Sequence, residues 1–191
     1  MKILAIQGSP RPEGHTQAVL DIILDAAAEA GASTEVIQLS EYHDLAGCIE
    51  CFACQQTPDE PGCVVLDDMQ DVLAKALEAD VIVLATPVFC WAPTWYLKMA
   101  MDRFYCTFKF ESATEYRCLL EGRKVAAVIS AGGDENDGAD LVIEMCRRLA
   151  QFSKTEWLGA FVAANVTSVE GIREDAKLTA EARAFGQKLA S

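Results

Sequence analysis

The chain has 191 residues, 51% of them hydrophobic, and a formal net charge of −13 at pH 7. Its length allows one domain with a substantial core. Its acidity disfavours nucleic acid, whose phosphates need Lys and Arg, and it also disfavours anionic membrane surfaces. No uninterrupted apolar run is long enough to span a bilayer.

The chain opens on KILAIQ (2–7), which has the continuous apolar character of a strand buried on both faces. A signal peptide would place a longer apolar region before a small-residue cleavage site, so we expect a cytoplasmic protein. The cytoplasm is reducing, which argues against structural disulfides among the eight cysteines.

Strand-like runs alternate with helical spacing along the rest of the chain. The expected strands are 2–7, 33–39, 80–85, 124–130 and 156–164. The expected helices are 16–30, 67–79, one from about 93, 139–152 and the tail from 169. This alternation predicts an α/β fold, a doubly wound five-stranded parallel sheet with helices on both faces. We expect a single domain over residues 1–191, with a cysteine-rich loop at 47–66 inserted after the second strand.

In such a sheet the ligand lies outside the carboxyl ends of the strands. The loop after the first strand, GSPRPEGHT (8–16), leads into a helix, so its backbone N–H groups favour an anion. Ser9 and Thr16 offer hydroxyls, and Arg11 offers a charged fork suited to phosphate. The glycine spacing and the missing lysine exclude a P-loop. The alternative is a tight strand-to-helix turn with no ligand.

GSPRPEGHT closely resembles the G-S-P-R-x-x-G-x-T loop of the flavodoxin-like NAD(P)H-dependent FMN reductases. ATPVFCWAPTWYLKMAMDR (85–103) resembles the second signature of that family, T-P-V-Y-W…K…D-R, and the resemblance covers nearly the whole chain. It implies a flavodoxin-like fold, FMN as cofactor, NAD(P)H as substrate, and a homodimer or homotetramer whose flavin site is completed at a subunit boundary. The implied phosphate-binding residues are Ser9, Arg11, Gly14, His15 and Thr16, with His15 in place of a frequent Asn.

The loop after the third strand, TPVFCWAP, could give a flavin ring a flat apolar wall and backbone groups. The residues concerned are Pro87, Val88, Phe89 and Trp91. Ordinary core packing of an aromatic loop is the alternative. Phe89 stands where the family usually has Tyr, and Cys90 departs from the family pattern.

The loop after the fourth strand, SAGGDENDG (130–138), contains two glycines that allow close backbone approach to a ligand. The resemblance implies ring contact by Ala131, Gly132 and Gly133. A mobile acidic surface loop is the alternative.

CIECFACQQTPDEPGC contains four cysteines, Cys48, Cys51, Cys54 and Cys63. The first three have the C-x2-C-x2-C spacing of a ferredoxin-type cluster run. Zinc sites usually use two separate Cys-x2-Cys pairs, an arrangement that is missing here. Four reduced cysteines, some buried as small apolar groups, are the alternative to a [4Fe–4S] cluster.

The iron–sulfur flavoproteins, a branch of the same family, have a compact four-cysteine motif at this point. Here the last gap is longer than usual, and Val64 stands where a ferredoxin has Pro. Because the loop follows the second strand, we expect it at the same sheet edge as the flavin loops. A cluster there could exchange single electrons with FMN, within one subunit or across a dimer.

The remaining cysteines have no ligand spacing. We expect Cys146 in the core and Cys90 as a packed thiol. His15 and His43 are isolated and are expected at the surface or as caps. Asp102 and Arg103 are expected to form a helix-end ion pair or a subunit contact.

The residues and the resemblance together predict an FMN-dependent oxidoreductase without catalytic side chains of its own, since the flavin carries the chemistry. Electrons would come from NAD(P)H or a low-potential donor and leave to a quinone, a flavin or a redox protein, with or without the cluster. A non-enzymatic flavin electron carrier or a thiol redox sensor is the alternative. A nucleotide hydrolase is disfavoured by the missing P-loop lysine.

Overall fold

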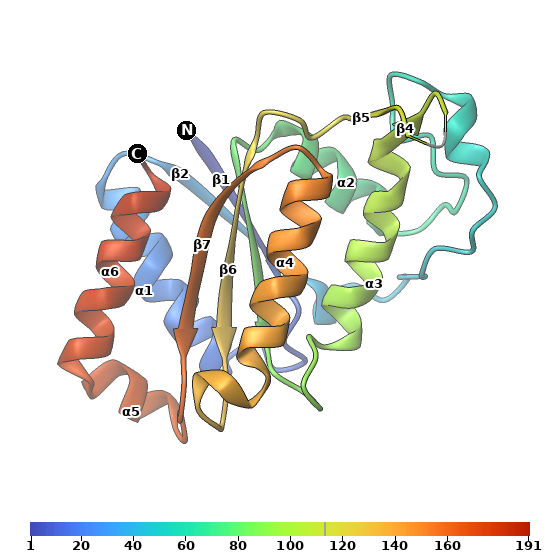
Figure 1. Ribbon diagram of the computed structural model, residues 1–191. Coiled ribbons are helices and arrows are strands. Elements are labelled where there is room, and N and C mark those ends of the chain that lie inside the picture. Colours follow the sequence, from blue (N-terminus) through green and yellow to red (C-terminus); the bar gives the residue numbers. More distant parts are fainter. Residues whose placement is uncertain (113) are drawn as a thin grey trace.

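The computed structural model describes residues 1–112 and 114–191, and its centre is a five-stranded sheet (Figure 1). Every pair of neighbouring strands is parallel, and the order is β2-β1-β3-β6-β7. This is the strand order of the flavodoxin-like doubly wound fold, so the predicted fold class is confirmed. The strands are β1 (Lys2–Gln7), β2 (Ser33–Gln38), β3 (Val81–Pro87), β6 (Lys124–Ser130) and β7 (Glu156–Ala163).

Helices cover both faces of the sheet (Figure 1). On one face lie α1 (His15–Glu29), α5 (Val169–Glu174) and α6 (Ala176–Leu189), and on the other lie α2 (Met69–Glu78), α3 (Trp95–Arg103) and α4 (Asp140–Phe152). Strand side chains alternate between the two resulting cores, because successive residues of a strand point to opposite faces. Ile3 and Ala5 contribute to the α1 side, whereas Leu4 and Ile6 contribute to the α3 side.

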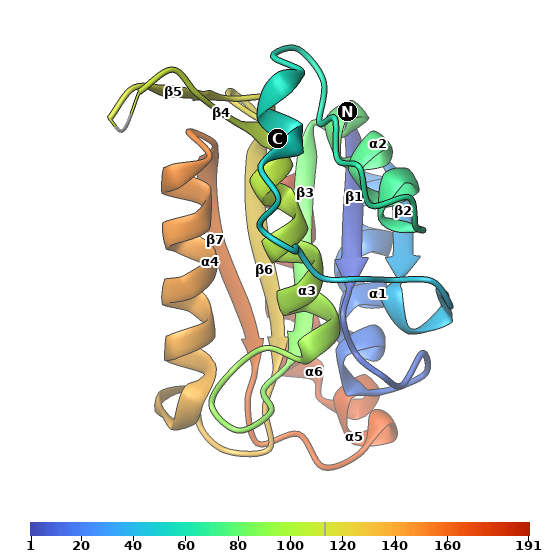
Figure 2. The ribbon, with the colours of Figure 1, turned by 90° about the vertical axis from the view of Figure 1, so that its right-hand side faces the viewer.

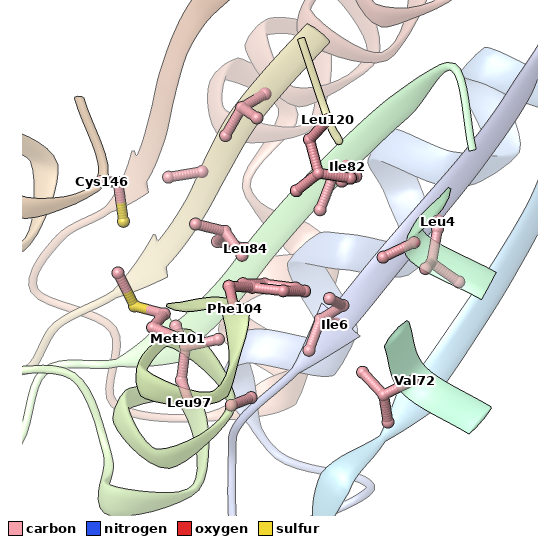
Figure 3. Packing of buried hydrophobic residues seen from close by; sticks show 14 of the residues in the cluster. Leu4, Ile6, Val72, Ile82, Leu84, Leu97, Met101, Phe104, Leu120 and Cys146 are labelled. Atoms are coloured by element: carbon pink, nitrogen blue, oxygen red, sulfur yellow. The ribbon is translucent and has the colours of Figure 1, made fainter. Parts of the chain in front are cut away.

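The core on the α3 side joins strands and helices through close apolar packing (Figure 3). Ile6 and Leu84 of the sheet lie opposite Leu97 and Phe104, and Cys146 of α4 is fully buried beside them, as expected. The α3 helix therefore has one fixed face, and its orientation along the sheet is set by the core. The α3 helix starts at the carboxyl edge of the sheet and ends toward the opposite edge (Figure 1).

Element ends differ from the expected ones by a few residues. The α3 helix begins at Trp95 rather than near residue 93, because the Thr94 hydroxyl accepts a hydrogen bond from Leu97 N at 3.3 Å and caps the helix. The tail forms two helices separated at Asp175. One hairpin was not expected: β4 (Phe108–Phe110) pairs with β5 (Tyr116–Cys118) in an antiparallel ladder.

The cysteine-rich loop takes a different course from the expected one. It begins after β2, but its short 3-10 helix η2 (Ala53–Gln56) lies beside β4, near the amino ends of the strands and away from the flavin loops (Figure 2). The Lys109 ammonium donates to Cys54 O at 2.7 Å, and Gln55 Nε2 donates to Phe108 O at 2.9 Å. The expectation that these cysteines share an edge with the flavin loops is therefore wrong, because the hairpin binds the loop at the other end of α3.

Candidate functional site

The loop between β1 and α1 folds back on itself around Ser9. Ser9 N donates to Gln7 Oε1 at 2.8 Å, and Arg11 N donates to Ser9 Oγ at 3.1 Å. Gly14 N donates to Arg11 O at 3.1 Å, so the loop is closed before the helix starts. Ser9 is buried, whereas the Arg11 side chain is exposed. The loop thus has a defined shape from its own hydrogen bonds.

The first turn of α1 begins at His15, with Gly14 as N-cap, and it receives no side-chain capping hydrogen bond. It also contains no acidic residue. The first N–H groups of a helix have no partner within the helix, and their dipoles favour an anion. This end of a 15-residue helix therefore suits a phosphate group, as the sequence predicts.

Two glutamines that sequence reasoning did not single out shape this loop. Gln7 is fully buried and accepts from Ser9 N, and Gln38 Nε2 donates to Ser9 O at 2.7 Å. Each is the buried polar last residue of its strand and follows an apolar pair, Ala5-Ile6 in β1 and Val36-Ile37 in β2, which is the signal that could have identified them. Together they hold Ser9 at the switch point between β1 and its neighbours.

Thr16 connects the phosphate loop to the other side of the site. It is 1% exposed, and its Oγ1 lies 2.8 Å from Ser130 Oγ at the end of β6. Ser130 immediately precedes the glycine loop, and Ser130 O accepts from Val88 N at 2.9 Å. These contacts bring the loops after β1, β3 and β6 together at one edge of the sheet.

Thr94 makes a second connection at this edge. Its Oγ1 donates to Gly8 O at 2.5 Å, while Gly8 N donates to Ala85 O at 2.8 Å. A Cβ atom on Gly8 would lie 2.7 Å from Leu97 Cβ, so this position requires glycine for the close approach of α3. The phosphate loop and the loop before α3 therefore form one rigid unit.

The loop after β3 makes a tight turn from Phe89 to Ala92, whose N–H and C=O groups bond each other at 2.9 and 3.0 Å. Its two central residues, Cys90 and Trp91, have φ values of 49° and 61°, a region that non-glycine residues rarely adopt. Phe89 and Trp91 are 50% and 63% exposed. Core packing of this loop is therefore excluded, and the expectation of a packed Cys90 thiol is wrong because this turn exposes it.

Five residues expected at the ring line one hollow of about 330 Å³, together with Cys90 and Asp137. These five are Val88, Trp91, Ala131, Gly132 and Gly133. Trp91 Nε1 donates to Asp137 Oδ1 at 2.9 Å and so closes one side of the hollow. Pro87 and Phe89 are outside its lining: Pro87 ends β3, and Phe89 pairs with Ala92.

Gly138, which the sequence did not single out, fixes the distance between the loop after β6 and the loop after β3. Its φ is +102°, and a Cβ atom there would lie 3.0 Å from both Cα and Cδ1 of Trp91. The Asp-Gly pair at 137–138 is a turn signal that could have pointed to it.

Arg11 lies on the outer side of the phosphate loop. With Gly14 and His15 it lines a separate hollow of about 760 Å³, whose opposite wall comes from α5 and the residues just before it, including Arg173 and Ser168. Glu13, Asp21 and Glu170 also line this hollow, and their charges oppose an anion there. The ring hollow is smaller, but it has the apolar wall and open backbone that a flavin ring needs.

The four cysteines of the cysteine-rich loop line one hollow of about 20 Å³ beside the end of α3. Cys48 and Cys51 are exposed on its open side, Cys54 is buried and Cys63 is half-buried. A fifth thiol, Cys106, also lines it, which sequence spacing could not show. Burial raises the pKa of Cys106 to about 12, so that sulfur remains a thiol at neutral pH.

Within residues 1–112 and 114–191, no group of three or more His, Cys, Asp or Glu side chains is arranged to hold a metal ion. A single thiolate-bound zinc ion needs its sulfurs at about 2.3 Å from one point. All eight cysteines are free thiols, so there is no disulfide. Four thiols around one hollow are the donor set that iron–sulfur clusters use.

A buried ion pair joins the two ends of the cysteine-rich loop. Arg103 NH1 donates to Asp67 Oδ2 at 2.6 Å and NH2 donates to Asp67 Oδ1 at 3.0 Å, and both side chains are 3% exposed or less. The same guanidinium donates to Ala46 O at 2.8 Å and to Val65 O at 3.1 Å. Arg103 therefore pairs with Asp67 and not with Asp102, which pairs with Lys98.

Backbone strain is concentrated beside the cysteines. Glu50 and Phe52, on either side of Cys51, have φ values of 55° and 58°. Such conformations cost free energy and persist where the surrounding contacts impose them, commonly at functional sites. The loop thus resembles the turn at Cys90 and Trp91 in carrying strained residues next to a hollow.

No helix in the described residues is long and apolar enough to cross a membrane.

A family model described as NADPH-dependent FMN reductase matches residues 1–169. An iron-sulfur flavoprotein of Methanocaldococcus jannaschii is 36% identical over 145 residues, which are 75% of this chain and 68% of that protein. An iron-sulfur flavoprotein of Methanosarcina thermophila is 32% identical over 144 residues, 75% of this chain and 70% of that protein.

Solved structures share the fold. An NAD(P)H:quinone oxidoreductase from Methanothermobacter marburgensis has a TM-score of 0.74 at 18% identity, covering 99% of this chain and 98% of that one. An FMN-dependent NADH-azoreductase from Bacillus anthracis, solved with FMN, has a TM-score of 0.73 at 18% identity and full coverage of both chains.

Proposed function

Because the chain belongs to the NADPH-dependent FMN reductase family, we propose that it binds FMN and uses NAD(P)H to reduce a small acceptor such as a quinone or a flavin. The observation that carries the proposal is the meeting of three loops at one sheet edge, joined by the Thr16–Ser130 and Thr94–Gly8 hydrogen bonds. That edge offers an anion-binding helix start and an apolar hollow side by side.

Each loop has a distinct part in this proposal. The N–H groups at the start of α1 and the hydroxyls of Ser9 and Thr16 bind the phosphate, and Arg11 adds positive charge from the outer side. Val88 and Trp91 pack against the ring, while Ala131, Gly132 and Gly133 offer backbone groups close to it. Bound FMN supplies the hydride and electron transfer chemistry. Pro87 and Phe89 support the turn, and Gly14 and His15 form the helix start.

The flavin site is tested by FMN affinity. The single variants Ser9→Ala and Arg11→Ala should each weaken FMN binding about tenfold or more, because a hydrogen bond to a charged group contributes about 1.5–3 kcal/mol. Arg148→Ala, which removes an exposed arginine on α4, is the matched control and should leave affinity unchanged. Undiminished FMN binding by the double variant Ser9→Ala/Arg11→Ala would contradict the proposal.

Catalysis is tested separately from binding. Anaerobic addition of NADH or NADPH to the FMN-loaded protein should bleach the flavin absorbance, and a quinone should then restore it. A protein that holds FMN but is not reduced by either nucleotide would instead be an electron carrier or a redox sensor, which is the competing hypothesis.

We also propose self-association as a homodimer or homotetramer. Phe89, Trp91 and Trp95 are all exposed near the ring hollow. Exposed apolar groups of this size commonly mark an interaction surface. Sedimentation of the wild type against Trp95→Lys tests this proposal: a charged side chain at that surface should shift the protein toward monomer, and a monomeric wild type would contradict it.

The finer part of the proposal is a [4Fe–4S] cluster held by Cys48, Cys51, Cys54 and Cys63. It is supported by their common hollow and by relatives named iron-sulfur flavoproteins. The nine-residue helix α3, about 13.5 Å long, runs between the ring loops and this hollow. Iron, sulfide and visible absorption of oxygen-free protein provide the test. Flavin bands without iron would leave a cluster-free reductase.

A further inference from the structure

Lys109 is a buried cation on β4 that points into the cysteine-rich loop. It is 5% exposed, and its Nζ donates to Cys54 O at 2.7 Å and to Pro61 O at 3.2 Å. Among the described residues no Asp or Glu lies within ion-pair distance of it. Lysine is almost never fully buried unless it is paired, because an ammonium without a counter-charge is costly to remove from water.

Arg103, the other buried cation of this region, does have a counter-charge. Arg103 lines the cysteine hollow, and its charge is balanced by Asp67 through two hydrogen bonds. Lys109 has only carbonyl oxygens as partners, so the region contains one positive charge that no carboxylate of the described chain neutralises. Asp59 also attracts Lys109, but it is paired with Arg117, so the cysteines or what they bind are the candidates for a counter-charge.

The cysteines lie within reach of this charge. Lys109 holds Cys54 by its carbonyl, and Pro61, its other partner, is two residues from Cys63. Thiolates bound to an iron–sulfur core form a group with net negative charge, whose reduction adds one further electron. Net charge and nearby polar groups set the potential of such clusters.

We propose that Lys109 is a positioning residue of the cysteine pocket, which fixes the loop between Cys54 and Cys63 and provides the counter-charge for a net-negative iron–sulfur cluster. This inference rests on the cluster part of the proposed function. It goes beyond that proposal by assigning a role to a residue outside the four-cysteine motif and by predicting an electrostatic effect on reduction.

Three variants separate the charge of Lys109 from its role as a hydrogen-bond donor. Lys109→Gln retains a donor for Cys54 O but has no charge, Lys109→Met has neither, and Lys109→Arg retains the charge. Lys177→Met, which removes an 85% exposed lysine on α6, is the matched control. Each protein is purified without oxygen and reconstituted with iron and sulfide, and FMN is measured in the same sample.

The reduction potential of the cluster is the decisive measurement. Both Lys109→Gln and Lys109→Met should shift it to more negative values, because the added electron loses an attractive charge, whereas Lys109→Arg and Lys177→Met should stay near the wild type. Competition with a chelator should show an iron affinity about 10- to 100-fold lower in Lys109→Met, as for lost partners of metal ligands in general. FMN content should be equal in all four.

Two results would overturn the inference. A wild-type potential in Lys109→Gln and Lys109→Met would show that the residue only anchors the loop, even if the iron affinity were lower. A wild type that binds FMN but takes up no iron would remove the cluster and this inference together, and it would leave the flavin site intact. If Lys109→Met retains too little iron for measurement, the potential of Lys109→Gln decides.

Discussion

Thr16 Oγ1 and Ser130 Oγ lie 2.8 Å apart although 114 residues separate them in the sequence. Both residues are at most 4% exposed, so the hydrogen bond between them is shielded from water. It fixes the first turn of α1 against the end of β6, and thereby sets the distance between the phosphate loop and the glycine loop.

This hydrogen bond can be tested by removing one partner and then both. Thr16→Val and Ser130→Ala should each lower the free energy of unfolding by about 1–3 kcal/mol, because the remaining hydroxyl is buried without its partner. The double variant should recover part of that loss. Urea unfolding of the FMN-free protein measures all three, and a double variant whose loss equals the sum of the single losses would contradict the prediction.

Gly138→Ala and Gly122→Ala form a matched pair. Both glycines have positive φ, so each alanine should cost about 1–2 kcal/mol of backbone strain. A Cβ atom at Gly138 also meets Trp91 at 3.0 Å, whereas nothing lies within 4 Å of one at Gly122. Thermal unfolding should therefore show the larger loss for Gly138→Ala, and only that variant should weaken FMN binding. Equal effects of the two variants would refute the role given to Gly138.

The burial of Cys146 leads us to predict that the free energy of unfolding decreases at alkaline pH. Burial raises the pKa of its thiol from 9.0 to about 12. Between these values the unfolded chain has lost the proton that the folded protein retains, so the free energy of unfolding falls as pH rises, by about 1.4 kcal/mol per pH unit at most. Below pH 9 the contribution is constant.

The control for this prediction is Cys146→Ala, whose stability should fall less steeply than that of the wild type between pH 9 and 11. Urea unfolding at closely spaced pH values gives both slopes, and the other ionisable groups cancel in the difference. Parallel curves for the two proteins would show that Cys146 does not cause the alkaline loss.

The parallel sheet could be predicted because strands buried on both faces appear as continuous apolar runs, such as 81–85 in β3. The β4–β5 hairpin could not. Its strands are three residues long, and Phe108 and Phe110 flank a lysine whose burial depends on the loop that it holds. A short alternating segment of this kind has no periodicity that a sequence window can detect.

The shared position of the candidate-site loops was predictable, because these loops follow the strands directly. Ser9, Thr16 and the glycines at 132 and 133 lie in loops that a doubly wound sheet brings to one edge. The location of the cysteines was not predictable, because a long connection takes its course from distant side chains. Lys109, Gln55 and the Arg103–Asp67 pair determine it here, and none of these contacts is local in sequence.

The anchoring of the cysteine-rich loop has a consequence for biosynthesis. Cys54 O, Pro58 O and Pro61 O are all held by Lys109 or Arg117, which are translated well after the cysteines. While the ribosome is still making the hairpin, the cysteine segment has emerged without its supports. The cysteine pocket is therefore complete only once the chain has been extended past Arg117.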